Sequence, residues 1–182
     1  MTALLEVPAI RQRAARLSVE DYHRLGELPV ELLRGNIIEK MPKSPSHQFH
    51  ADRLRKMLSA QLSPDWVVRQ EGPLTFADSE PEPDVAVVRG PEERYRSVHP
   101  SAAELVIEVA ISSLEIDRVK AHIYAEAGVK EYWIVCPEER QVEVFRQPGA
   151  SGYSERTMLT SPTMLECASL PGVRVDFAKL FA

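Results

Sequence analysis

Two apolar runs with an amphipathic segment between them constrain the fold of this chain most strongly. Residues 104–111 and 131–136 are rich in Val, Ile and aromatic side chains, which favours buried β-strands. Residues 114–127 predict a helix with one apolar face, formed by Ile116, Val119, Ile123 and Ala127. Gly128 then suits the C-cap of that helix. A strand, a helix and a strand in this order predict a βαβ crossover with parallel strands and a right-handed connection.

The residues before this unit predict a short helix, a hairpin and a longer helix. The helix begins at Ser18 in a capping-box pattern. The hairpin strands are 30–33 and 37–41, and Gly35 with Asn36 is expected to supply the positive φ of the turn. A second helix is expected from about Ser46 to Leu62, because leucines recur at spacing four.

Further strands are expected on both sides of the βαβ unit. They lie at 66–70, 72–76, 84–88, 141–146, 153–159, 164–167 and 173–175, before a last helical turn at 176–181. We therefore predict an α/β (α+β) protein with one mixed sheet flanked by helices. Residues 1–16 read as a flexible arm, and residues 17–182 as a single domain.

The composition is that of an ordinary globular protein, with 44% hydrophobic and 27% charged residues among 182. A net charge of −5 argues against a protein that coats nucleic acid, but it leaves room for a nuclease with a local basic groove. Cys136 and Cys167 lack zinc-site spacing and are expected to be reduced thiols. No run reaches the length of a membrane span and the N-terminus is a poor signal peptide, so a cytoplasmic protein without a membrane partner is expected.

Asp84 and Glu108 are the residues that point to chemistry. Each lies in a β-rich run, where a buried charge is costly unless a partner such as a metal ion compensates it. Their hard oxygens, together with the backbone carbonyl of Val109, would suit Mg²⁺ or Mn²⁺. A lysine follows at Lys120 and could stabilise charge on a phosphate. From the residues alone, Asp84 follows a proline and is more often a turn residue than a ligand in such a place, and Glu108 could face water.

The chain resembles the Uma-two family of small endonucleases, within the broad PD-(D/E)xK restriction-endonuclease-like superfamily. The resemblance extends over about residues 17–146 and rests on blocks in a fixed order. These are VELLRGNIIEKM at 30–41, SPSHQ at 44–48, EPDVAVV at 82–88, LVIEV at 105–109, DRVK at 117–120, YAEAGVKEYWIV at 124–135 and VEVFR at 142–146.

The resemblance implies a restriction-endonuclease-like mixed sheet with Asp84 and Glu108 as Mg²⁺ ligands. The position of the superfamily lysine holds Ala110 here, and the family pattern points instead to Lys120 on the following helix. Six helical residues span only about 9 Å, so a lysine there can reach back to the strand end. The stretch after the Glu108 strand also departs from the family pattern, because it lacks a proline.

Three further residues are candidates for the site. Glu31 matches an extra acidic residue found upstream in the superfamily, with a solvated strand residue as the alternative. His47 matches the family's His-Gln position and could contact a phosphate at a helix N-terminus. Tyr124 shares a helical face with Lys120 and could orient it or line a substrate groove.

The leading hypothesis is a Mg²⁺-dependent endonuclease, with DNA as substrate and a homodimer expected by analogy with enzymes that cut both strands. Catalysis would rest on Asp84, Glu108, Lys120 and Glu31. A nuclease fold retained for binding or assembly is the alternative, favoured by Ala110 and the acidic pI. A hydrolase of another phosphate ester is a third possibility, because carboxylates do not specify the leaving group.

Overall fold

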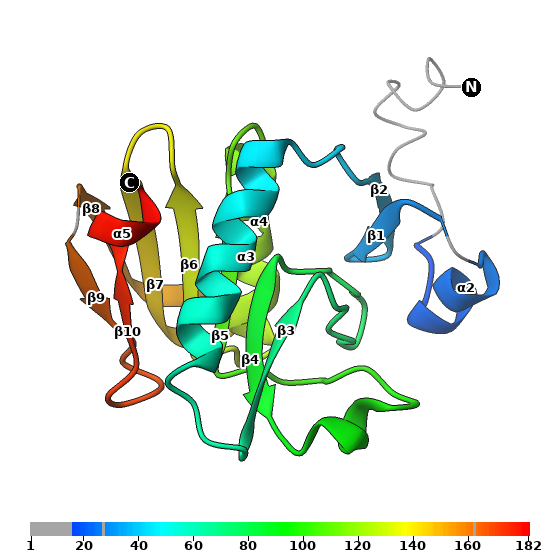
Figure 1. The fold of residues 1–182 in the computed structure, drawn as a ribbon. Helices are drawn as coiled ribbons and strands as arrows, with labels where there is room; N and C mark the ends of the chain where they lie inside the picture. The colour runs from blue at the N-terminus through cyan, green and yellow to red at the C-terminus, as the bar shows by residue number, and fades with distance from the viewer. Residues whose placement is uncertain (1–15, 27, 162) are drawn as a thin grey trace.

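The computed structural model describes residues 16–26, 28–161 and 163–182, so the arm predicted at 1–16 lies almost wholly outside the described residues (Figure 1). One six-stranded sheet has the order β3-β4-β5-β6-β7-β8. Its strands are β3 Trp66–Gln70, β4 Val85–Arg89, β5 Leu105–Val109, β6 Glu131–Cys136, β7 Gln141–Gly149 and β8 Gly152–Thr160. Strands β5 and β6 are parallel and the other neighbours antiparallel, which confirms the predicted parallel pair and the mixed sheet.

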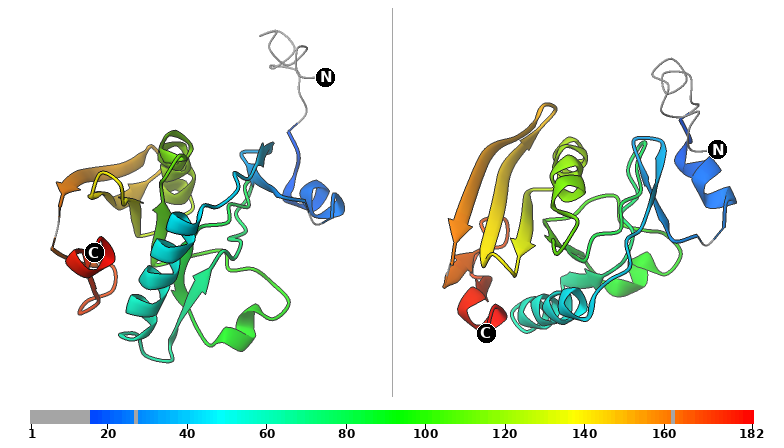
Figure 2. Two further views of the ribbon diagram at one scale, coloured as in Figure 1. Left: turned by 45° about the horizontal axis from the view of Figure 1, so that its top comes forward. Right: turned by 90° about the horizontal axis from the view of Figure 1, so that it is seen from above.

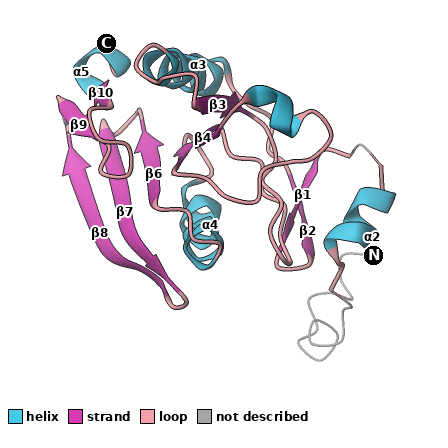
Figure 3. Cartoon of the chain, turned by 90° about the horizontal axis from the view of Figure 1, so that it is seen from below, coloured by secondary structure: helices cyan, strands magenta, loops and turns pink. Residues whose placement is uncertain are grey.

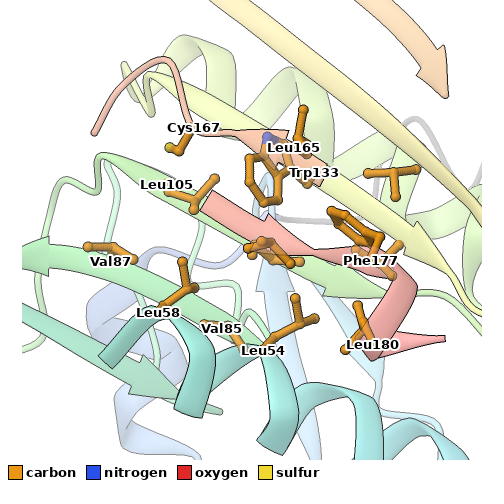
Figure 4. Close-up of a cluster of buried hydrophobic side chains, with 14 of the residues drawn as sticks. Leu54, Leu58, Val85, Val87, Leu105, Trp133, Leu165, Cys167, Phe177 and Leu180 are labelled. Carbon is orange, nitrogen blue, oxygen red and sulfur yellow. The ribbon is translucent and has the colours of Figure 1, made fainter. Parts of the chain in front are cut away.

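Helices α3 (Pro45–Ser59) and α4 (Leu114–Glu126) lie on opposite faces of the sheet (Figure 3). Alternate residues of each strand point to opposite faces, so each helix meets its own set of side chains. Leu54 and Leu58 of α3 pack with Val85, Val87 and Leu105 (Figure 4). The α4 side has a separate aromatic cluster that includes Tyr124 and Tyr132.

The C-terminal residues extend the core on the α3 side of the sheet. Strands β9 (Met164–Glu166) and β10 (Arg174–Asp176) form a two-stranded ribbon that leads into α5 (Phe177–Leu180). This unit lies beside α3 (Figure 2). The buried carboxylate of Glu131 links it to the sheet, because it accepts hydrogen bonds from the indole of Trp133 and the backbone amide of Ser169.

The N-terminal hairpin is present, but its turn differs from the prediction. Strands β1 (Val30–Leu33) and β2 (Asn36–Glu39) follow helix α2 (Val19–Arg24), whose capping box is formed as predicted. The positive φ angles belong to Arg34 (50°) and Gly35 (73°), whereas Asn36 begins β2. A Cβ on Gly35 would come within 2.6 Å of Arg16, so this position requires glycine for space as well as for conformation.

Two predicted elements have different limits in the structure. Residues 72–76 form no strand, because the amides of Leu74 and Phe76 donate to loop carbonyls of Pro81 and Ser79. Pro73 also lacks the N–H that a ladder needs. Helix α3 ends at Ser59, short of the predicted limit.

Helix α4 buries a face that agrees only in part with the one predicted, because Ile123 of the predicted face is buried. Val119, expected in the apolar face, is 55% exposed. The buried side instead includes Asp117, Lys120, Ala121 and Tyr124. The prediction missed the buried polar residues because it assumed an apolar face, whereas this helix also buries polar groups against polar partners. Within the ranges that the structure describes, no helix has the length and apolar character needed to cross a membrane.

Candidate active site

Asp84 and Glu108 lie together at one end of the sheet. Strands β4 and β5 are antiparallel, so the residue before β4 meets the last residues of β5. The amide of Val109 donates to Asp84 Oδ2 over 2.7 Å, and the amide of Asp84 donates to Glu108 Oε2 over 3.2 Å. Both carboxylates are buried. The structure therefore brings together the two acids that the sequence predicted as a pair.

Lys120 reaches back from α4 to the same place. Its ammonium lies 3.1 Å from Glu108 Oε1 and 3.0 Å from Glu31 Oε2, with only 6% of the residue exposed. Glu31 comes from hairpin strand β1 and is also buried. The hydroxyl of Tyr124, one helical turn after Lys120, donates to Glu108 Oε1 over 2.9 Å. Four of the predicted residues thus form one contiguous network.

His47 and Lys43 approach Asp84 from the α3 side. His47, in the first turn of α3, places Nε2 2.9 Å from Asp84 Oδ2. Its Nδ1 is buried and has no partner within the described residues. Lys43, two residues before α3, places its ammonium 3.0 Å from Asp84 Oδ1 and 3.1 Å from Glu71 Oε1. Each oxygen of Asp84 therefore faces a basic side chain.

These groups surround a cavity of about 420 Å³. Carboxylates outnumber lysines in its lining by seven to three. The carboxylates are Glu31, Glu39, Glu71, Glu82, Asp84, Glu108 and Asp117, and the lysines are Lys40, Lys43 and Lys120. Apolar atoms of Ile38, Ile111 and Ile116 complete the wall. An excess of acidic groups in one partly enclosed space favours the uptake of a cation.

Burial and crowding shift the pKa values of these groups. For Glu108, burial together with repulsion from Asp84, Asp117 and Glu31 outweighs Lys120 and raises the pKa well above its usual range. For Asp117, burial raises the pKa to about 6. Burial opposes charge on Lys120 as well, but Glu108, Glu31 and Asp117 outweigh it and raise its pKa. The ammonium of Lys120 thus interacts with the negative charge of three carboxylates, those of Glu108, Glu31 and Asp117.

Asp84 behaves differently from its neighbour Glu108. Burial again opposes its charge, but hydrogen bonding to His47, the charge of Lys43 and the amide of Val109 prevail, so its pKa is lowered. Asp84 is therefore an ionised carboxylate at neutral pH. A permanently charged acid beside one of raised pKa is an arrangement typical of functional sites.

The donor set fits a hard divalent cation. Asp84 and Glu108 supply oxygens of the type that Mg²⁺ and Mn²⁺ prefer, within a cavity that has an excess of acids. Among the described residues, no three His, Cys, Asp or Glu side chains are already gathered as a metal cluster. The ammonium groups of Lys43 and Lys120 instead approach the two carboxylates. A cation would therefore exchange with at least one of these lysines.

Two predicted site residues have positions that change their role. Tyr124 has no exposed surface and does not line the cavity, so the predicted direct contact with substrate does not fit its position. Its hydroxyl positions Glu108 instead. Val109 offers its amide to Asp84, and a role for its carbonyl remains a prediction.

Lys43, Glu71 and Asp117 line the cavity without having been singled out as site residues from the sequence. Asp117 belongs to the DRVK block, which was a usable signal. No sequence pattern marked Lys43 or Glu71 as a site residue, because charged residues in loops are usually exposed to solvent. Only the folded chain shows that they meet at Asp84.

A comparison with models of protein families identifies the family of this chain. The model named Uma2, described as a putative restriction endonuclease, matches residues 19–178. The chain belongs to the Uma2 family. No curated protein matches it.

Among solved structures, this Uma2 chain is similar to the crystal structure of a putative nuclease belonging to DUF820 from Anabaena variabilis ATCC 29413. The two share 20% sequence identity with a TM-score of 0.75, over 91% of this chain and 97% of that one. This likeness confirms the predicted restriction-endonuclease-like fold, in which a mixed sheet is flanked by helices. The family resemblance inferred from the motif blocks is confirmed as well.

Proposed function

We propose that this Uma2 chain is a Mg²⁺-dependent endonuclease that hydrolyses DNA phosphodiester bonds. The observation that carries the proposal is the convergence of Asp84, Glu108 and Lys120, from three different elements, on one cavity. Membership of a family described as a putative restriction endonuclease supports it.

Asp84 and Glu108 would hold the cation, with the backbone carbonyl of Val109 as a third oxygen ligand. When bound, Mg²⁺ supplies neutralisation of phosphate charge and a lower pKa for the attacking water. The hydrogen bonds from Val109 and His47 fix one oxygen of Asp84, and Tyr124 fixes one oxygen of Glu108. These contacts from protein groups orient both carboxylates.

Lys120 would orient the attacking water and stabilise negative charge that develops on the phosphate. Its ammonium is held between Glu31 and Glu108, so little reorganisation is needed when charge develops. Glu31 therefore acts by positioning Lys120. His47 lines the cavity and would face the substrate as well as Asp84.

Plasmid cleavage in Mg²⁺ or Mn²⁺ tests the proposal directly. Wild type should cut, whereas Asp84→Asn, which preserves side-chain shape, should lose at least about a hundredfold in rate. Asp65→Asn is the matched control, because Asp65 is exposed and lies outside the cavity. Equal cleavage by wild type and Asp84→Asn would overturn the site assignment.

A nuclease fold retained for binding or assembly is the second candidate function. It is favoured by Lys43 and Lys120, whose ammonium groups already neutralise Asp84 and Glu108. Calorimetric titration with Mn²⁺ separates the two candidates. An endonuclease should bind the ion in a manner that Asp84→Asn abolishes, whereas an inactive module should give no binding at millimolar metal.

A homodimer is part of the proposal, because cleavage of both DNA strands usually requires two sites. Sedimentation velocity of the full chain, with and without a DNA duplex, measures the oligomeric state. A monomer that cuts only one strand under both conditions would contradict the dimer and leave the site assignment standing.

A further inference from the structure

Lys43 is a basic residue of the cavity that lies outside every motif block of the sequence, between the blocks at 30–41 and 44–48. It lies in the segment between β2 and α3, directly before Ser44, the N-cap of α3. Its ammonium bridges Asp84 Oδ1 at 3.0 Å and Glu71 Oε1 at 3.1 Å. The backbone amide of Glu71 in turn donates to the carbonyl of Asp84. Lys43 thus closes one side of the cavity across two acids.

The two oxygens of Asp84 differ in their partners. Oδ2 accepts the amide of Val109 and faces the ring of His47. Within the described part of the chain, Oδ1 meets a single donor, the ammonium of Lys43. Because the other oxygen is committed to the scaffold, Oδ1 is the oxygen through which Asp84 would engage a cation. The ammonium of Lys43 therefore occupies the position beside Oδ1 that a bound cation would take.

Lys43 also differs from Lys120 in its freedom to move. Lys120 is on a helix and buried between Glu31 and Glu108. The Lys43 side chain is 32% exposed at the cavity wall and extends from a segment outside any helix or strand. A long flexible lysine there can leave Asp84 at little cost, and a lysine is a common point-charge partner of phosphate.

We propose that Lys43 is the phosphate-binding residue of this site, and that it occupies Asp84 until a divalent cation replaces it. This inference rests on the proposed nuclease function and names one residue that contacts the substrate. A cation at Asp84 would repel the neighbouring ammonium, because two positive charges in close contact inside a partly buried site repel each other strongly. The incoming phosphate then offers Lys43 a new anionic partner in the same cavity. No covalent step involves Lys43.

The test compares two ligands on the full-length protein, because the proposal predicts opposite effects on them. Mn²⁺ is titrated calorimetrically into metal-free wild type, Lys43→Gln, Lys43→Arg and Lys56→Gln. A phosphorothioate-linked DNA duplex, which resists cleavage, is then titrated by fluorescence anisotropy at saturating Mn²⁺. Lys56→Gln is the matched control, since it removes the same charge from a residue that pairs with Asp52 on an exposed part of α3.

Lys43→Gln should bind Mn²⁺ about tenfold more tightly than wild type and the duplex about tenfold more weakly. Lys43→Arg and Lys56→Gln should stay within about twofold of wild type for both ligands. Lys43→Ala serves as a second neutral variant if the melting temperature of Lys43→Gln is lowered.

Three results would overturn the inference. Weaker binding of both ligands by both neutral variants would show that Lys43 only supports the structure. Unchanged affinities, with Mn²⁺-dependent cleavage in wild type, would leave the nuclease function standing and remove Lys43 from substrate binding. Absence of Mn²⁺ binding to wild type would overturn the proposed function itself and this inference with it.

Discussion

The ammonium nitrogen of Lys120 lies 3.1 Å from Oε1 of Glu108, although one residue comes from helix α4 and the other from strand β5. Glu31 of the N-terminal hairpin completes the arrangement at 3.0 Å from the same nitrogen. A lysine on the helix that follows β5 thus reaches the carboxylate on that strand, where the position two residues after Glu108 holds Ala110.

Replacement of Lys120 by methionine should abolish cleavage and destabilise the fold. The substitution keeps the length of the side chain but leaves buried Glu31 and Glu108 without their cation. Removal of one partner of a buried ion pair typically costs about 3–5 kcal/mol. Urea denaturation at neutral pH measures the loss. Lys130→Met is the control, because exposed Lys130 pairs with Glu104 and should cost less than about 1 kcal/mol. Comparable losses in the two variants would contradict the buried network.

Tyr124→Phe should reduce kcat about tenfold while KM stays near that of wild type, because Tyr124 positions Glu108 and does not reach the cavity. The lost hydrogen bond should lower the free energy of unfolding by about 1 kcal/mol. Tyr153→Phe is a matched control, since its hydroxyl donates to the carbonyl of Val129 away from the site. It should show a similar loss of stability with normal kcat. A raised KM in Tyr124→Phe would instead indicate direct contact with the substrate.

Asp117→Asn should raise the free energy of unfolding at alkaline pH. At acidic pH the substitution should change it little, because the carboxyl of Asp117 is then already neutral. Burial raises the pKa of Asp117 to about 6 from its ordinary value of 3.8, so the folded state holds this proton more tightly than the unfolded state. The ionised form therefore costs stability above pH 6, and the cost disappears as the pH falls toward about 4. The variant should gain up to about 3 kcal/mol at about pH 8.

Urea denaturation of wild type and variant at about pH 4 and about pH 8 checks this sign. Asp52→Asn is the contrasting control. Hydrogen bonds from Lys56 and Arg55 lower the pKa of Asp52, so its contribution is present above the unfolded pKa and lost in acid. A variant of Asp117 that is less stable than wild type at both pH values would show that the carboxylate is needed for structure.

The two cysteines should be unreactive in the folded protein. Burial raises the pKa of Cys136 to about 11 and that of Cys167 to about 12, and the reactive species is the thiolate. Both thiols are free and buried. Labelling with a thiol reagent at about pH 8 should be at least about a hundredfold slower in native protein than in denaturant. Rapid labelling of one thiol without urea would reveal local opening around β6 or β9.

The sequence by itself determined the strands of the central sheet, the βαβ connection and the two acids of the site. Apolar runs at β5 and β6 and the helical segment between them specify those elements through burial alone. Glu108 was visible because a carboxylate inside such a run needs a compensating partner. Lys120 was noted from its place after Glu108, and the resemblance of the motif blocks added Glu31; both side chains contact each other in the network.

Only the tertiary structure decided which residues surround Asp84. Lys43 and Glu71 lie in connecting segments, where local sequence gives no preference for a partner, and they meet because the start of α3 and the end of β3 lie at the same end of the sheet. The buried face of α4 was predicted only in part, because periodicity counts apolar residues, whereas buried Lys120 is stabilised by an ion pair with Glu31 of a distant strand. Contacts between elements set these positions, and such contacts depend on the packing of the whole chain rather than on any local pattern.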